Sequence, residues 1–185
     1  TEIYTLSLHD ALPISGIGGR TLTMPLTTPD ILPTLLGLAG VAIPESVEGE
    51  DLSPLLRSGR DVDRAALYMS VSPFTSGVPA DKSREYRAIR TNRHTYARSL
   101  DGPWLLFDDA ADPFQTKNLV GDAANATLVK ELDARLQAQL RRIGDDFRPA
   151  QAYLTDWSFK VGVHGSVPYS ATPGEAQTPH RRPAP

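Results

Sequence analysis

The segment that most constrains the fold of this chain is residues 30–40, which read DILPTLLGLAG. Asp30 is a favourable N-cap, because its carboxylate can accept hydrogen bonds from the free N–H groups of a first helical turn. Pro33 then stands at the third helical position, where its missing N–H has no helical partner to lose. Gly40 can end the helix in the left-handed conformation. We therefore predict a short helix over residues 30–40.

This helix is apolar on nearly every side, which is typical of a helix inside a large domain. Burying each large side chain is worth about 1.5–3 kcal/mol. The rest of the chain is too small to cover them all. The sequence therefore predicts a large partner domain that precedes this helix in the same protein, and the side chains it would cover are Ile31, Leu32, Leu35, Leu36, Leu38 and Ala39.

The first fifteen residues have a different origin in our interpretation. Residues 4–14 read YTLSLHDALPI, which is the translation, in one frame, of a widely used sequencing adapter. We interpret residues 1–15 as an artefact joined to a truncated coding sequence and exclude them from the fold prediction. We therefore expect the true protein to begin further upstream.

Composition excludes several kinds of partner and site. The net charge of −3 and the pI of about 5.8 argue against a nucleic-acid partner, which needs a basic surface. The absence of cysteine excludes disulfides, thiolate metal sites and a cysteine nucleophile within these 185 residues. The longest apolar run, residues 35–43, is well short of the roughly 18 residues that span a membrane, so we expect no membrane partner.

The hydrophobic periodicity changes in the second half of the chain. The new pattern predicts an antiparallel meander of three or four strands. A tight hairpin is expected at residues 92–93, because asparagine tolerates a positive φ. A long loop rich in serine, proline and glycine is expected over residues 72–82. The predicted strands are residues 66–72, 86–91, 94–98 and 104–108.

A long amphipathic helix follows, over residues 122–144, with Asp122 as its cap and Gly144 as its end. A shorter helical turn is expected over residues 52–56. Residues 150–163 carry aromatic side chains and form a short packed extension in this prediction, and residues 165–185 form a disordered tail. The predicted apolar stripe of the long helix is Leu128, Leu132, Leu136, Leu140 and Ile143.

The order and spacing of several motifs resemble the C-terminal part of sulfatases. Residues 28–40 match the family's Asp, Pro-Thr, leucine run and Ala-Gly, and residues 48–52 match its Gly-x-Ser/Asp-Leu turn. Residues 106–108, 112–113 and 118–119 match the family's Leu-Tyr-Asp-Leu, Asp-Pro-x-Glu and Asn-Leu. The chain departs from this pattern at three positions, Phe107 for Tyr, Asp109 for Leu and Gln115 for Glu.

The resemblance implies an α/β fold of the alkaline-phosphatase/sulfatase kind. Residues 16–64 would be the C-terminal end of the large sulfatase domain. Residues 65–148 would be the C-terminal subdomain, a small antiparallel sheet with a C-terminal helix, and residues 149–185 an extension and disordered tail.

The resemblance also implies hydrolysis of sulfuric esters. The family uses a formylglycine made from Cys or Ser in a Cys/Ser-x-Pro-x-Arg motif, beside a calcium ion held by Asp and Asn oxygens. Neither that motif nor the paired metal ligands occur in this chain. We therefore assign no catalytic residue, no metal ligand and no cofactor to it, and expect Ca²⁺ and formylglycine in a missing N-terminal domain. We expect this chain alone to be inactive, and the parent protein to be periplasmic or secreted.

Two arginines are candidates for the substrate cleft, namely Arg87 and Arg90, which with Arg98 alternate with apolar positions. They could face an anionic sulfate-ester substrate across the domain junction, or they could form ion pairs or lie on a solvated sheet face. Acidic residues 108, 109 and 112 could be metal ligands, but aspartates that cap backbone N–H groups at a strand end are the preferred interpretation.

Two alternatives to a sulfatase fragment stay open. A related phosphodiesterase or phosphonate hydrolase would carry an unmodified Thr or Ser nucleophile upstream. A stand-alone binding module, made of the meander and its helix without any catalytic role, is the third hypothesis. The apolar helix predicted over residues 30–40 argues against that module.

Overall fold

The computed structural model describes residues 21–70 and 84–158 of the chain. These residues form two compact units. The first unit comprises residues 21–67 with residues 90–94, and the sheet unit comprises residues 68–70, 84–89 and 95–158. The adapter interpretation of residues 1–15, the loop predicted over residues 72–82 and the disordered tail predicted from residue 165 lie outside the described residues.

Helix α1 of the first unit spans Thr28–Ala39, and its N-cap lies three residues before the predicted one. Its N-cap is Thr27, and Asp30 is the third helical residue, so the prediction that Asp30 is the N-cap was wrong. The carboxylate of Asp30 reaches back to the Thr27 N–H (2.8 Å), as in a capping box. Pro33 consequently lies inside the helix. Gly40, with a φ of 69°, ends it in the left-handed conformation as predicted.

Helix α2, Ser53–Ser58, packs against α1 and confirms the helical turn predicted there. Two glycines, one in α1 and one in the loop that precedes α2, allow that loop to approach α1 closely. A Cβ at Gly37 would lie 2.4 Å from a carboxylate oxygen of Asp51, and a Cβ at Gly49 would lie 2.3 Å from the carbonyl oxygen of Pro29. The guanidinium of Arg57 donates to the Gly37 and Leu38 carbonyls near the end of α1, which lacks a basic residue in its last turn.

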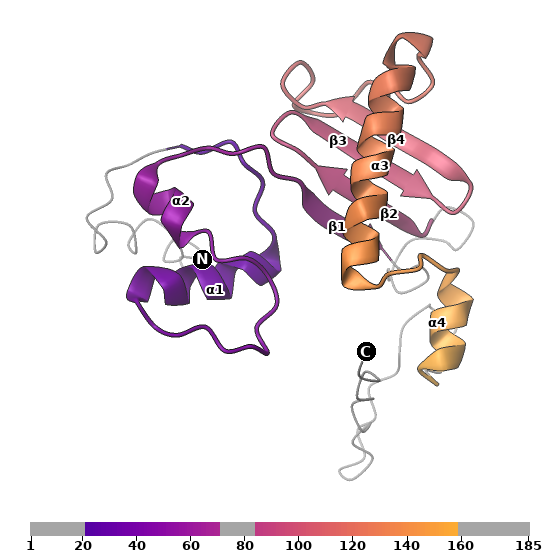
Figure 1. The fold of residues 1–185 in the computed structure, drawn as a ribbon. Coiled ribbons are helices and arrows are strands. Elements are labelled where there is room, and N and C mark those ends of the chain that lie inside the picture. Colours follow the sequence, from indigo (N-terminus) through magenta and orange to yellow (C-terminus); the bar gives the residue numbers. More distant parts are fainter. Residues whose placement is uncertain (1–20, 71–83, 159–185) are drawn as a thin grey trace, which may run out of the picture. The chain divides into compact units, whose positions relative to one another are not determined.

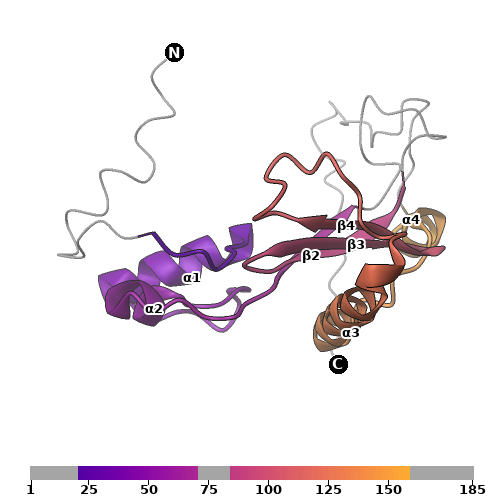
Figure 2. The ribbon, with the colours of Figure 1, turned by 90° about the horizontal axis from the view of Figure 1, so that it is seen from above.

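The sheet unit is built on the predicted antiparallel meander, whose strands lie side by side in chain order (Figure 1). Helix α3, Ala126–Ile143, runs along one face of this sheet (Figure 2). A short 3₁₀ turn, Ala123–Asn125, precedes α3, and Asp122 caps that turn rather than α3 itself. Gly144 ends α3 as predicted. The strands are β1, Ala66–Ser70; β2, Tyr86–Arg90; β3, His94–Ser99; and β4, Gly102–Asp108.

The core between α3 and the sheet differs in detail from the predicted stripe. Val129 is buried in place of Leu128, and Ile143, in the last turn, is 37% exposed. On the sheet, Ile89, Tyr96 and Leu106 are fully buried. The helix residues that complete this core are Leu132, Leu136 and Leu140.

The turn between β2 and β3, residues 91–93, includes the predicted pair 92–93 but has a different basis. Asn92 does not adopt a positive φ. The hydroxyl of Thr91 instead accepts hydrogen bonds from the N–H groups of Arg93 (3.2 Å) and His94 (2.9 Å). The amide of Asn92 donates to the Val62 carbonyl (3.1 Å) within the first unit. A side chain that closes its own turn therefore replaces the special backbone conformation that we expected.

Helix α4, Ala150–Asp156, lies within the predicted C-terminal extension. Ala150, Tyr153 and Leu154 are buried, so this helix is packed and not a loose end. Within residues 21–70 and 84–158, no helix combines the length and apolar character needed to cross a bilayer.

Replacing Gly49 by alanine tests the close approach of the loop to α1. Gly49→Ala meets both a positive φ of 99° and the Pro29 carbonyl, whereas Gly40→Ala meets only a positive φ, of 69°, with open space around it. We expect Gly49→Ala to cost about 1–3 kcal/mol of unfolding free energy and Gly40→Ala clearly less, measured by urea titration. Equal losses would contradict the close contact.

Candidate functional site

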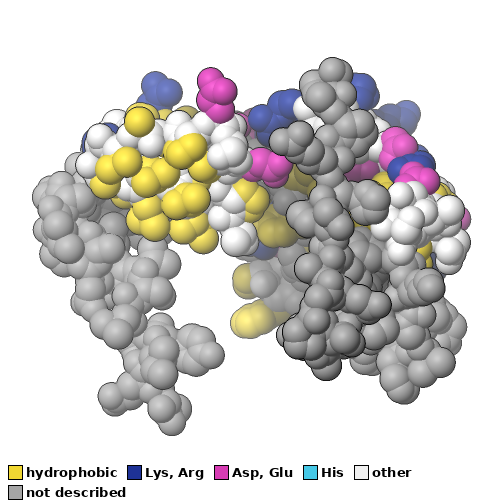
Figure 3. Space-filling view, turned by 90° about the horizontal axis from the view of Figure 1, so that it is seen from below, with side chains coloured by type: hydrophobic (Ala, Val, Ile, Leu, Met, Phe, Trp, Pro, Cys, Tyr) yellow, Lys and Arg dark blue, Asp and Glu magenta, His cyan; other side chains and the backbone are white. Residues whose placement is uncertain are grey.

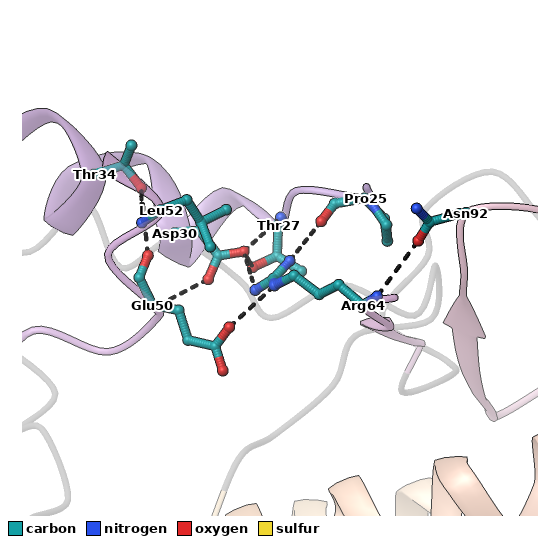
Figure 4. A network of polar contacts seen from close by, with 8 residues as sticks. All are labelled: Pro25, Thr27, Asp30, Thr34, Glu50, Leu52, Arg64 and Asn92. Atoms are coloured by element: carbon teal, nitrogen blue, oxygen red, sulfur yellow. Dashed lines mark hydrogen bonds and ion pairs between the residues drawn. The ribbon is translucent and has the colours of Figure 1, made fainter. Parts of the chain in front are cut away.

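A buried polar network holds the first unit together (Figure 4), and Asp30 is its centre. Asp30 as a whole residue is only 1% exposed. Its carboxylate accepts hydrogen bonds from the hydroxyl of Thr27 (2.6 Å), the N–H of Glu50 (2.9 Å) and the guanidinium of Arg64 (2.8 Å). Arg64 also donates to a carboxylate oxygen of Glu50 (3.0 Å) and to the carbonyl of Pro25 (2.5 Å). One carboxylate thus joins the start of α1 to two segments that follow it in the chain.

Thr34, one helical turn after Asp30, extends this network. Its hydroxyl donates to the Glu50 carbonyl (3.3 Å) and accepts from the Leu52 N–H (3.0 Å). Asp30 and Thr34 are both buried and lie on the same side of α1 because they are four residues apart. The helix therefore turns its polar side, and not its leucines, toward the rest of the first unit.

The opposite side of α1 presents apolar side chains to solvent. Ile31, Leu32 and Leu35 are 45%, 53% and 50% exposed. The yellow surface in Figure 3 shows apolar side chains gathered on one face of this unit. Contiguous apolar patches of this kind mark interaction surfaces. We name this surface the α1 apolar face; its members are Ile31, Leu32 and Leu35.

The pKa of Asp30 reflects its contacts. Burial alone would raise the pKa, but hydrogen bonds from Thr27, from the Glu50 N–H and from Arg64 outweigh burial and bring the pKa below its ordinary value. The carboxylate is therefore ionised in the folded protein at neutral pH and contributes to stability as an anion.

The two arginines predicted for the substrate cleft have different surroundings. Arg87 is buried, at 2% exposure, and its guanidinium forms an ion pair with Asp145 inside the sheet unit. Arg87 therefore forms an ion pair, which was one of the alternatives that we left open, and its role at a substrate stays a prediction. Arg90 is exposed, and its role at a substrate stays a prediction.

Arg98 also forms an ion pair, with Asp133 of α3 at 3.0 Å. The same carboxylate accepts a hydrogen bond from the hydroxyl of Tyr96 (2.8 Å). Burial, and then the nearby Asp133 carboxylate, raise the pKa of Tyr96 above its ordinary value, so this tyrosine stays neutral. These side chains connect the sheet to α3 and leave no free nucleophile or base among themselves.

Of the acidic residues at the end of β4 and just after it, Asp108 and Asp112 cap backbone N–H groups, as the preferred interpretation predicted, whereas Asp109 binds two side-chain donors. Asp108 accepts from the N–H groups of residues 110 and 111, and Asp112 accepts from the N–H of Lys117 (2.8 Å). Asp109 accepts from the hydroxyl of Thr95 and the amide of Gln115, both at 2.7 Å. In the part of the chain that the structure describes, no group of three or more His, Cys, Asp or Glu side chains could hold a metal ion.

Replacing Asp30 by asparagine tests the network of the first unit. Asp30→Asn keeps the size of the side chain but removes the charge that pairs with Arg64. We expect a loss of roughly 1.5–3 kcal/mol of unfolding free energy at pH 7, measured by urea titration. The exposed Asp61, which also accepts three hydrogen bonds from residues 23 and 24, gives the matched control Asp61→Asn, for which we expect a smaller loss.

The effect of Asp30→Asn on the unfolding free energy should depend on pH. Because the pKa of Asp30 is lower in the folded than in the unfolded chain, its contribution is complete above the unfolded value of about 3.9 and is lost as the pH falls through the folded value. The stability difference between the unmodified chain and Asp30→Asn should therefore be constant from pH 5 to pH 7 and shrink below about pH 4. A stability difference that is as large at pH 2 as at pH 7 would contradict an ionised Asp30.

Known proteins resemble this chain over most of its length. The family profile described as "N-sulphoglucosamine sulphohydrolase, C-terminal" matches residues 18–142. An ulvan-active sulfatase of Formosa agariphila is 44% identical over 166 residues, which cover 87% of this chain and 32% of that protein. An endo-4-O-sulfatase of Bacteroides thetaiotaomicron is 34% identical over 134 residues, which cover 65% of this chain and 26% of that protein.

Solved structures agree with these relatives. One, described as a complex with its substrate D-glucosamine-2-N,6-O-disulfate, superposes with a TM-score of 0.53 and 26% identity over 66% of this chain and 25% of the solved chain. The chain thus spans about a quarter to a third of the length of the proteins it matches. The family profile and the extended identity to the ulvan-active sulfatase show that this chain belongs to the sulfatase family and corresponds to its C-terminal part.

Proposed function

We propose that this chain is the C-terminal part of a sulfuric ester hydrolase that acts on sulfated carbohydrates. The observation that supports this most directly is the 44% identity to an ulvan-active sulfatase across 87% of the chain. The structure bound to a disulfated glucosamine supports the same class of substrate. The family resemblance also supports a periplasmic or extracellular location for the parent protein.

The reaction itself would depend on residues that precede this chain. The described residues contain no group of three or more His, Cys, Asp or Glu side chains that could hold a metal ion, and the whole sequence has no Cys/Ser-x-Pro-x-Arg motif. We propose that both Ca²⁺ and the formylglycine nucleophile belong to the preceding part of the parent protein. This chain would then complete the core of that part, and Arg87 and Arg90 are our candidates for contact with the anionic substrate.

The α1 apolar face is the surface that we propose for this completion, with the preceding part of the same polypeptide as its partner. The relatives are about three times as long as the region they share with this chain, so a domain large enough to cover the face is available in them. The face is formed by a helix whose polar side is already occupied by the Asp30 network. Two leucines of this helix, Leu32 and Leu35, therefore stay exposed in the first unit.

Polar substitutions on the α1 apolar face should make the chain alone less prone to aggregate but should destabilise the protein that includes the preceding part. We expect Leu32→Ser with Leu35→Ser to reduce light scattering by the chain alone, and to lower the unfolding free energy of the longer protein by about 1–3 kcal/mol. Phe114→Ser is the matched control, since Phe114 is 87% exposed in the sheet unit, and should change neither measurement. A double variant that leaves the longer protein equally stable would contradict the docking proposal.

An assay with two substrates that share a leaving group tests the proposed activity. We expect the chain alone to release no 4-nitrophenol from 4-nitrophenyl sulfate, and the protein that includes the preceding part to do so. The same protein should hydrolyse bis(4-nitrophenyl) phosphate more slowly. Faster hydrolysis of the phosphate diester would favour the phosphodiesterase alternative, and turnover by the chain alone would contradict an upstream reaction centre.

A further inference from the structure

Arg87 lies at a point where four segments of the sheet unit meet. A guanidinium has five N–H donors, and here each has an acceptor. Nε and one terminal nitrogen donate to the carboxylate of Asp145 (2.5 and 3.2 Å), and that terminal nitrogen also donates to the hydroxyl of Tyr153 (3.2 Å). The other terminal nitrogen donates to the carbonyls of Ser70 (3.3 Å) and Tyr86 (3.1 Å).

Only one of these partners carries a charge that balances Arg87. The side chain of Arg87 is 2% exposed and that of Asp145 is 11% exposed, so the pair is almost completely removed from water. Without Asp145, a cation would stay buried with only neutral acceptors, which is strongly unfavourable. The sheet therefore contains a positive charge whose counter-charge arrives from 58 residues later in the chain.

The segment that brings this counter-charge makes further contacts with the same part of the sheet unit. The ring of Phe147 lies 4.5 Å from the Arg87 guanidinium, and Phe147 adopts a φ of 46°, which is rare for a bulky side chain. The N–H of Ala150, at the start of α4, donates to a carboxylate oxygen of Glu85 (3.1 Å). Tyr153 and Leu154 of α4 are buried.

We propose that residues 144–157 form a strap that attaches to and detaches from the sheet unit as one cooperative element, with Asp145 and Arg87 as its clasp. The strap follows directly after the region matched by the family profile, which ends at residue 142. The strap binds Glu85 and Arg87, and Arg87 in turn binds the Ser70 carbonyl at the end of β1. Because these bonds are close together, losing the ion pair between Asp145 and Arg87 should free the whole segment. Local units of this kind open separately from the rest of a fold.

Amide hydrogen exchange on the full chain tests the strap. In Asp145→Asn, we expect the amides of residues 147–157 to exchange roughly ten- to a hundredfold faster, because a bond to a charged partner is lost, while α3 residues 129–140 keep their protection. The matched control is Asp156→Asn, which removes the exposed ion pair between Arg148 and Asp156 within the same segment. It should leave the exchange of residues 147–154 within about twofold of the unmodified chain.

A milder variant covers the case in which Asp145→Asn fails to fold. Tyr153→Phe removes the hydroxyl that accepts from Arg87 and from the Arg148 N–H and donates to Asp145, and it leaves the ion pair in place. We expect a smaller acceleration, of about three- to tenfold, again over residues 147–157 together. Unchanged exchange in both variants, or acceleration confined to one or two amides, would overturn the cooperative strap, and so would equal acceleration in α3.

Discussion

The burial of one carboxylate decides which way α1 faces. Besides the Thr27 donors at the start of α1, Asp30 accepts from the Glu50 N–H and from Arg64, so the side of the helix that carries Asp30 must lie inward. Thr34 follows on the same side, and the leucines at positions 32 and 35 are then turned outward. The apolar face on which the docking proposal rests is therefore a consequence of polar bonding within the first unit, and not of a poorly packed helix.

Much of the fold follows from local patterns in the sequence. The strand meander, the α3 helix and the glycines that end α1 and α3 were predicted correctly, because each depends on residues a few positions apart. The errors have local causes too. Thr27 and Asp30 form a capping-box pair, and treating Asp30 as the cap overlooked the threonine three residues before it.

The roles of the charged residues were much less predictable. Arg87 and Arg90 are three residues apart and read alike in the sequence, yet one is buried against Asp145 and the other is exposed. The carboxylate that pairs with Arg87 is 58 positions away, and no periodicity in the sequence indicates a contact of that range. The family was recognisable because many weak motifs keep their order, whereas a single ion pair has no such signature.

The strand order sets apart the one long-range contact on which the sheet unit depends. Strands that pair in chain order, followed by the helix that covers them, rely mainly on contacts of low sequence separation, which favour fast folding. The contact between Arg87 and Asp145 joins residues 58 positions apart. Burying Arg87 without its anion is unfavourable, so the unit is complete only when that distant segment is in place.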